Sequence, residues 1–230
     1  MGDFYMILSR RLSSFFLAVS FLILSFTGAR VLPAVAEEAP LVIIDPGHGG
    51  TDAGAIGTRG TCEKDLNLAV AQELAQRFSE AGIPVLLTRT TDALVLKEGE
   101  DVKGMRKQKD LYNRAALAAL YPEATFISIH MNAFPVEKYR GLQVYYNKNS
   151  TESARLAQRI TERVRAEIDP VYTRVPNFRG EELYLLSHVT GRAVLVECGF
   201  LSNSEEEAKL LEKDYQKKLS FCIFYAMMEE

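Results

Sequence analysis

Cysteine is scarce in this chain of 230 residues, which contains only Cys62, Cys198 and Cys222. An odd and small number of cysteines excludes a fold that disulfides hold together in place of a large core. Cys222 lies in an apolar pattern with helical spacing and is predicted to belong to the core. The sequence leaves open whether Cys62 and Cys198 form a bridge.

A large excess of positive or negative charge is also absent, since the formal net charge is only -3. A chain of this charge has no strongly basic field to attract nucleic acid or an anionic membrane surface, so no nucleic-acid partner is expected. Internal repeats and low-complexity stretches are absent after residue 40. Hydrophobic residues make up 47% of the chain, which is enough for the core of one domain of roughly 190 residues.

The N-terminus has the pattern of a targeting segment. Arg10 and Arg11 precede an apolar stretch over residues 12–28, and the small residues Ala34 and Ala36 follow it. This order is typical of a secretory signal with its cleavage site. The apolar stretch is also long enough for an uncleaved membrane anchor. We therefore expect a signal peptide or signal anchor over residues 1–36, and an exported domain after it.

Apolar runs with strand character alternate with stripes of helical spacing. The strand candidates are residues 41–45, 84–88, 125–130, 141–146, 183–186 and 193–198. The helical stripes are Leu66, Val70, Leu74 and Phe78; Leu111, Ala115, Ala118 and Leu120; Ala157, Ile160, Val164 and Ile168; and Tyr215, Leu219, Ile223 and Met227. This alternation predicts a single α/β domain with a mixed, mostly parallel sheet covered by helices on both faces. Two irregular loops, 91–106 and 169–182, are candidate walls of a substrate groove.

Three of the apolar runs end in a side chain that can hold or work a metal ion. The first leads into His48, the second into His130 and the third into Glu197. In an open α/β sheet, side chains just beyond the carboxyl ends of the strands meet in one crevice. Two histidines with a carboxylate are a common ligand set for hydrolytic zinc, and a further carboxylate is then needed to move protons.

Each of these residues also has a simpler interpretation. His48 lies among glycines that suit an ordinary tight turn, although the pattern of a phosphate-binding loop is absent. A lone His130 at the end of a strand is more often a hydrogen-bonding group than a ligand. Glu197 is harder to explain in this way, because it follows four apolar residues and a buried carboxylate is costly unless it is paired or metal-bound.

Four further residues are less certain candidates. Glu63 and Asp65 both begin a helical stripe, where acids are favoured anyway, and physical reasoning alone does not separate them as ligands. Asn132 is either a residue that orients a ligand or substrate, or an ordinary turn residue. His188 follows a short apolar run, and we expect it to make a loop hydrogen bond rather than to bind metal.

Four segments together resemble a known family, the zinc-dependent N-acetylmuramoyl-L-alanine amidases of bacterial cell walls (the amidase 3 family). The segments are Asp45-Pro46-Gly47-His48-Gly49-Gly50, Glu63-Lys64-Asp65, Ser128-Ile129-His130-Met131-Asn132-Ala133 and Val196-Glu197-Cys198-Gly199-Phe200-Leu201-Ser202-Asn203. The resemblance covers the chain from about residue 41 to the C-terminus, and it implies a catalytic domain over residues 41–230 with a sheet of about six strands. It also implies Zn2+ as the cofactor, His48, Glu63 and His130 as its ligands, and Glu197 as the catalytic acid and base. Asn132 keeps a role towards substrate or ligand as a hypothesis.

The segment over residues 130–141 and the lack of wall-binding repeats most resemble the germination-specific amidases of the spore cortex, the CwlD type. This implies hydrolysis of the amide between muramic acid and the L-alanine of the stem peptide during sporulation. A muramic acid deacetylase would then complete muramic-δ-lactam. The expected location is extracytoplasmic, in the cell wall or the forespore intermembrane space, either free or anchored through the N-terminal segment.

Some features leave alternatives or depart from the family. A zinc carboxypeptidase acting on stem peptides and a non-catalytic wall-binding module are the competing hypotheses. Cys198 stands where the family usually has a small or apolar residue, which raises the question of thiol chemistry near the metal. Contacts with the carboxylates of the stem peptide are open to five arginines, namely Arg89, Arg114, Arg174, Arg179 and Arg192.

Overall fold

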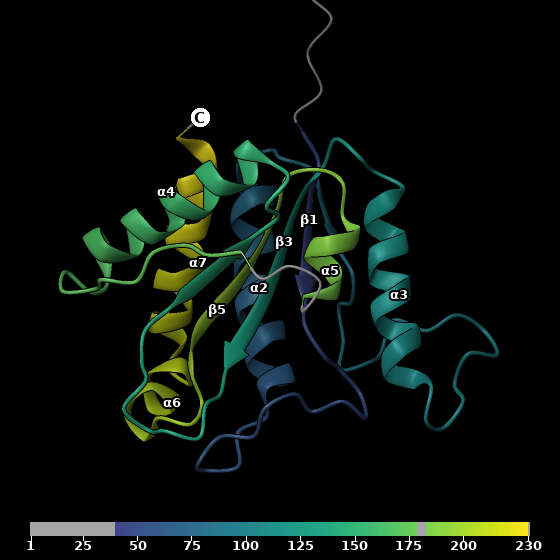
Figure 1. Ribbon diagram of the computed structural model, residues 1–230, viewed down its shortest axis with the longest axis horizontal. Coiled ribbons are helices and arrows are strands. Elements are labelled where there is room, and N and C mark those ends of the chain that lie inside the picture. Colours follow the sequence, from purple (N-terminus) through teal and green to yellow (C-terminus); the bar gives the residue numbers. More distant parts are fainter. Residues whose placement is uncertain (1–39, 179–182, 230) are drawn as a thin grey trace, which may run out of the picture. The chain divides into compact units, whose positions relative to one another are not determined.

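A five-stranded mixed sheet forms the centre of the described part of the chain, residues 40–178 and 183–229 of the computed structural model (Figure 1). Its strands are β1 (Val42–Pro46), β2 (Val85–Leu87), β3 (Thr125–Asn132), β4 (Gln143–Tyr146) and β5 (Ala193–Phe200). The spatial order is β2-β1-β3-β5-β4, and β4 alone runs antiparallel to its neighbour. The predicted α/β fold with a mostly parallel sheet is confirmed. The expected targeting segment over residues 1–36 lies outside the described residues.

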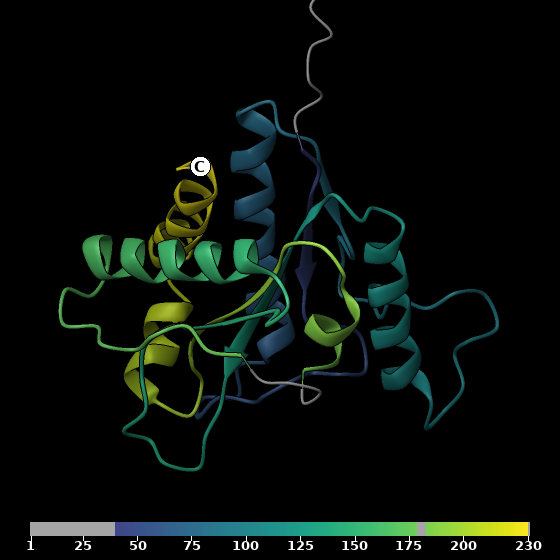
Figure 2. The same cartoon turned by 45° about the horizontal axis from the view of Figure 1, so that its top comes forward.

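Helices cover both faces of the sheet (Figures 1 and 2). They are α2 (Glu63–Glu80), α3 (Arg106–Ala119), α4 (Thr151–Glu167), α5 (Tyr184–His188), α6 (Ser204–Leu210) and α7 (Lys213–Met228). Helices α2, α4 and α7 share the larger hydrophobic core with one face, whereas α3 and α5 pack on the other. None of the helices in the described ranges combines the length and apolar character needed to cross a bilayer.

The alternation of β3 explains how one strand serves both layers. Ile127, Ile129 and Met131 belong to the core under α2, α4 and α7, while Phe126 belongs to the core under α3 and α5. Because successive side chains of a strand point to opposite faces, His130 lies on the same face as Phe126. The period of the strand thus places His130 on that face, near the carboxyl end of β3, where it contacts Glu63 at the start of α2.

One predicted strand is a helix, and this accounts for five strands in place of about six. Residues 183–186 were expected to be extended, but Tyr184–His188 forms the short helix α5. Leu185, Leu186 and Val189 are all buried in the core under α3 and α5, and their spacing fits one helical turn rather than an alternating strand. A short apolar run does not distinguish these two structures by its periodicity.

The three cysteines are all free thiols, so no bridge joins Cys62 to Cys198. Cys198 and Cys222 are completely buried, as was expected for Cys222, and Cys62 is the residue that precedes α2. The fold thus relies on its core and on hydrogen bonds rather than on covalent cross-links.

Candidate metal centre

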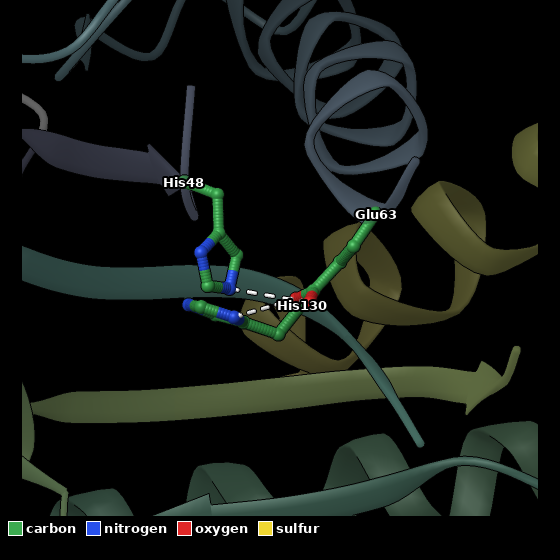
Figure 3. Close-up of side chains that lie close together, drawn as sticks. All are labelled: His48, Glu63 and His130. Carbon is green, nitrogen blue, oxygen red and sulfur yellow. Dashed lines mark hydrogen bonds and ion pairs between the residues drawn. The ribbon is translucent and has the colours of Figure 1, made fainter. Parts of the chain in front are cut away.

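Three side chains from separate elements converge beside the carboxyl ends of β1 and β3 (Figure 3). His48 lies two residues beyond β1, Glu63 is the first residue of α2, and His130 belongs to β3. Their candidate ligand atoms all lie within 4.8 Å of one another. The Nε2 atom of His48 is 3.2 Å from one carboxylate oxygen of Glu63, and the Nδ1 atom of His130 is 2.9 Å from the other. Two imidazoles and one carboxylate at this spacing can hold a zinc ion.

The turn after β1 has an unusual backbone that brings the two histidines together. His48 adopts a φ of 61°, in the left-handed region that residues other than glycine rarely occupy. Strain of this kind persists only where the surrounding structure enforces it, and it concentrates at functional sites. Gly47 passes so close to His130 that a Cβ atom there would lie 2.2 Å from the imidazole ring. The glycine is therefore required for the approach of His130 to the turn.

Asp52 holds the imidazole of His48 from the far side. One of its carboxylate oxygens lies 2.7 Å from Nδ1 of His48, and the ammonium group of Lys107 is 3.5 Å from the same oxygen. Burial alone would raise the pKa of Asp52, but the hydrogen bond and charge of His48 lower it. A carboxylate on Nδ1 fixes the tautomer and leaves Nε2 as the ligand atom, which is the usual arrangement around zinc-binding histidines.

Glu63 is almost fully buried, and its carboxylate is surrounded by donors. The backbone N–H of Ala55 donates to one oxygen at 2.8 Å, and the N–H of Met131 donates to the other at 3.1 Å. Burial would raise the pKa of Glu63, but hydrogen bonds with His130 and His48 lower it far below its usual range. The side chain is thus an anion at neutral pH, as a metal ligand must be.

The structure distinguishes Glu63 from its neighbour in the same helical turn. Asp65 is exposed, whereas Glu63 lies between the two histidines. The same anion acts on His130. Burial would lower the pKa of His130, but the hydrogen bond and charge of Glu63 raise it. Within residues 40–178 and 183–229, this is the one group of three metal-binding side chains close enough to share an ion.

Glu197 lies on the strand next to His130. The two residues are partners in the parallel register of β3 and β5, so their side chains point to the same face of the sheet. Neighbouring strands are about 4.8 Å apart, and the charge of Glu197 contributes to the raised pKa of His130. A carboxylate placed beside a metal site in this way is suited to proton transfer.

The other candidates lie apart from the three converging side chains. His188 is exposed on α5, where its ring stacks on Tyr184 and its Nδ1 lies 2.8 Å from the carbonyl oxygen of that residue. Asn132 is the last residue of β3 and is partly buried, and its backbone carbonyl accepts a hydrogen bond from Leu201. Its role towards substrate stays a prediction.

Two arginines that were candidates for substrate contacts are structural instead. Arg114 is 1% exposed, and it donates to the backbone carbonyl of His48 at 2.7 Å and to the carboxylates of Asp45 and Asp110 at 2.7 and 2.8 Å. Arg89 is buried as well and donates to the carbonyl of Gly47 at 3.0 Å. Both guanidinium groups support the turn that carries His48, and neither faces solvent.

The remaining arginines have other positions. Arg192 donates to the hydroxyl of Thr125 at 2.7 Å, and the guanidinium of Arg174 lies over the ring of Phe200 at 5.0 Å. Arg179 lies outside the described residues. The sequence reasoning missed Asp52, whose only local signal is an acid four residues after a histidine. It also missed that Arg114 joins Asp110, four residues earlier in α3, to the distant Asp45.

Comparison with known proteins identifies relatives over nearly the whole described chain. A family model described as N-acetylmuramoyl-L-alanine amidase (Amidase_3) matches residues 42–229. The germination-specific N-acetylmuramoyl-L-alanine amidase of Bacillus subtilis is 34% identical over 188 residues, which cover 82% of this chain and 78% of that protein. The amidase LytC of the same organism is 30% identical over 193 residues, which cover 83% of this chain but 35% of LytC.

Solved structures give the same result. The CwlD amidase from Clostridioides difficile, determined in complex with the GerS lipoprotein, matches with a TM-score of 0.78 and 35% identity and covers 83% of this chain and 97% of that one. The amidase AmiC2 of Nostoc punctiforme matches with a TM-score of 0.69 and 28% identity, over 83% and 96% of the two chains.

Proposed function

Because the chain belongs to the N-acetylmuramoyl-L-alanine amidase family, we propose that it is a zinc-dependent amidase of the spore cortex. Family membership makes it an enzyme that hydrolyses the amide between muramic acid and L-alanine in peptidoglycan. The dependence on zinc, the roles of single residues and the place in sporulation are the parts we propose. The observation that carries the zinc dependence and the residue roles is the convergence of His48, Glu63 and His130, with Glu197 paired to His130 on the neighbouring strand.

His48, Glu63 and His130 would hold the zinc ion. The donor set of two nitrogens and one oxygen suits zinc, and Asp52 prepares His48 by occupying its other nitrogen. Glu63 is already an anion, so it need not lose a proton when the ion binds. When bound, zinc supplies a Lewis acid that polarises the scissile carbonyl and makes water more acidic.

Glu197 is the proposed general base and acid. Its carboxylate accepts a proton from the attacking water and returns it to the nitrogen of the leaving L-alanine. The sheet supports this role, because Glu197 is paired with His130 in β3 on one side and with Gln143 in β4 on the other. A side chain held by two neighbouring strands keeps its position while the substrate changes around it.

The proposed place of action is the spore cortex, outside the cytoplasm. The relative in Bacillus subtilis is germination-specific by name, and the CwlD structure comes from a complex with a lipoprotein. We propose that residues 1–36 export this domain, and that its product is the muramic acid from which a deacetylase completes muramic-δ-lactam. A lipoprotein partner of the kind found with CwlD is a further candidate for this chain.

The residue roles are tested on purified peptidoglycan with the zinc-loaded protein. Glu197→Ala should retain zinc but lose turnover by about a hundredfold to ten-thousandfold, the range that general acid–base catalysis usually contributes to the rate. Glu205→Ala, an exposed acid of α6, is the matched control and should behave as wild type. His48→Ala should lose both zinc and activity. Full turnover by Glu197→Ala would rule out its proposed role.

Mass spectrometry of the digest separates the competing activities. An amidase releases intact stem peptides with N-terminal alanine and leaves unsubstituted muramic acid, whereas a carboxypeptidase releases single amino acids from the peptide end. The cortex role needs a separate test, in a Bacillus subtilis strain that lacks its germination-specific amidase. Restored muramic-δ-lactam in the spores would support it, and intact amidase activity without restored lactam would contradict the cortex role alone.

A further inference from the structure

Helix α6 begins with three adjacent acids, of which only the first behaves as a surface residue. Glu205 is exposed, but Glu206 is 7% exposed and Glu207 is completely buried. Acids in a first helical turn ordinarily face solvent, where the helix dipole favours them. Burying two carboxylates is unfavourable unless each is satisfied by hydrogen bonds. Their partners therefore indicate what the helix holds.

Glu207 is enclosed by the loop that leads to Glu63. The hydroxyl of Thr58 and the backbone N–H of Arg59 donate to its carboxylate, the latter at 3.1 Å to both oxygens. Gly57 lies against the same group, since a Cβ there would be 2.2 Å from a carboxylate oxygen. Burial would raise the pKa of Glu207, but the hydrogen bonds of Thr58 and Thr61 lower it, so the group is an anion at neutral pH.

The loop that encloses Glu207 is continuous with the metal site. Ile56 and Cys62 form an antiparallel bridge that closes the loop. Directly beside this bridge, the N–H of Ala55 donates to the carboxylate of Glu63 at 2.8 Å, and the N–H of Glu63 donates back to the carbonyl of Ala55 at 2.9 Å. A shift of the loop would therefore move a donor that orients the ligand carboxylate.

Glu206 holds a different part of the site. One of its carboxylate oxygens accepts from the N–H of Phe200 at 3.0 Å and from the N–H of Gly141 at 2.7 Å. Phe200 ends β5, the strand of Glu197, and Gly141 ends the loop that follows β3. This loop exposes the rings of Phe134 and Tyr139, which pack edge to face with centroids 4.9 Å apart.

We propose that α6 positions the two halves of the site through these neighbouring carboxylates. Glu207 sets the loop that orients the ligand Glu63, and Glu206 sets the loop after β3 against the end of β5. In Figure 1, α6 lies at the end of the molecule to which the arrow of β3 points, the end where both loops run. The proposal deepens the proposed function and rests on it, since it assigns positioning residues to the zinc site and to the adjoining wall.

The chemistry explains why position 207 needs a carboxylate, since donors reach both of its oxygens. An anion accepts from several N–H and O–H donors at once, whereas the amide group of glutamine would present an NH2 to some of them. Two buried donors that face each other are both left without an acceptor, which is unfavourable. Glu207→Gln should therefore resemble Glu207→Ala more than it resembles wild type.

The test compares Glu207→Ala, Glu206→Ala and the control Glu205→Ala in the full chain. Zinc affinity is measured by competition with a chelator, on protein shown by circular dichroism to be folded. We expect the zinc affinity of Glu207→Ala to fall by about tenfold or more, the usual effect of removing a group that orients a metal ligand. Glu206→Ala should keep zinc affinity within about twofold, because Glu206 holds no proposed ligand. It should raise the KM for polymeric peptidoglycan about fivefold, because the loop after β3 loses its attachment to the end of β5. Glu205→Ala should change neither quantity.

Gly57→Ala keeps the test decisive if Glu207→Ala fails to fold. Gly57→Ala pushes the loop off an intact Glu207 and should also weaken zinc binding. If Glu207 acts through the loop, Thr58→Ala and Glu207→Ala should be non-additive in a double-mutant cycle of zinc affinity. Wild-type zinc affinity in folded Gly57→Ala would overturn the proposal, as would wild-type zinc affinity in folded Glu207→Ala or equal zinc losses in Glu206→Ala and Glu207→Ala. A wild-type protein that binds no zinc would overturn the proposed function instead.

Discussion

The two faces of the central sheet are stabilised in different ways. On the face covered by α2, α4 and α7, the strands present apolar side chains along their whole length, namely Val42, Ile44, Ile127, Ile129, Met131, Val194, Val196 and Cys198. On the face covered by α3 and α5, apolar residues give way to polar ones towards the carboxyl ends of the strands. The polar residues there are Asp45, Ser128, His130 and Glu197.

The difference separates stability from precision. Apolar packing is not directional and tolerates small shifts, whereas a buried network of hydrogen bonds fixes the positions of its members. Asp45 accepts hydrogen bonds from Thr88, Ser128 and Arg114, and Arg114 in turn holds the carbonyl of His48. The apolar face thus supplies most of the buried surface, and the polar face determines where the histidines stand.

Removal of the central cation should have the largest effect on this comparison. Arg114→Met leaves the buried carboxylates of Asp45 and Asp110 without their cation. Breaking a buried ion pair from one side costs about 3–5 kcal/mol in the free energy of unfolding. Urea denaturation at pH 7 measures the loss. Arg155→Met, at an exposed arginine of α4, is the control and should change stability by less than about 0.5 kcal/mol.

The pH dependence of this loss has a definite sign. Burial would raise the pKa of Asp45, but Arg114 and the hydroxyl donors lower it, so its contribution is present above the unfolded pKa of about 3.9 and is lost as pH falls through the lower folded value. In Arg114→Met, burial without the cation should instead raise the pKa of Asp45. Protonation then relieves the penalty, so the variant should differ less from wild type at pH 4 than at pH 7. An equal or larger difference at pH 4 would contradict an electrostatic origin.

A cavity on the apolar face should cost nearly as much stability and leave the site intact. Leu74 of α2 is completely buried in the larger core. Leu74→Ala should lower the free energy of unfolding by about 3 kcal/mol, in the range usual for such truncations. Its zinc affinity, measured by chelator competition well below the unfolding temperature, should remain within about twofold of wild type. Leu74 packs in the apolar core and takes no part in the hydrogen bonds around the proposed ligands. If the zinc affinity of Leu74→Ala fell about tenfold or more, as expected for changes around a ligand, the two faces would not differ in the way described.

The sequence was informative where the signal is local. The apolar, β-branched run over residues 125–130 predicted β3, and the apolar context of Glu197 marked it as unusual. Helical stripes predicted α2, α3, α4 and α7. The candidate ligands were recognised because each follows or begins an element, and parallel strands bring their ends together.

The remainder depends on partners far apart in the chain. Asp45 and Arg114 are 69 residues apart, and Thr58 and Glu207 are 149 apart, so no window of sequence shows either contact. Helix α6 was missed, although Asn203 caps it by accepting from two backbone N–H groups, a local signal that could have revealed it. The burial of Glu207 had no such signal, because an acid in a first turn is ordinarily exposed.

On the polar face, a change outside the proposed ligands should alter zinc binding with little loss of stability. Asp52→Asn replaces the carboxylate that holds Nδ1 of His48 with a neutral group. We expect zinc affinity to fall about tenfold, equivalent to about 1.4 kcal/mol, because such partners orient the ligand and raise its basicity. Asp65→Asn, at an exposed acid of α2, is the matched control. Equal zinc affinity in Asp52→Asn and Asp65→Asn would show that the polar face does not act through His48.

The smallest effect is expected at Cys198, the neighbour of Glu197 on the opposite face. Its thiol is completely buried in the larger core, and burial raises its pKa far above the ordinary value, so it stays protonated at neutral pH and is a poor nucleophile. Cys198→Ala should therefore lower the free energy of unfolding by about 1 kcal/mol, as the loss of one buried atom does. Turnover of peptidoglycan and resistance to thiol-blocking reagents should match wild type. A loss of activity larger than the loss of folded protein would show that Cys198, although buried in the apolar core, also positions groups on the polar face. The separation between stability and precision would then fail at the residue next to the proposed base.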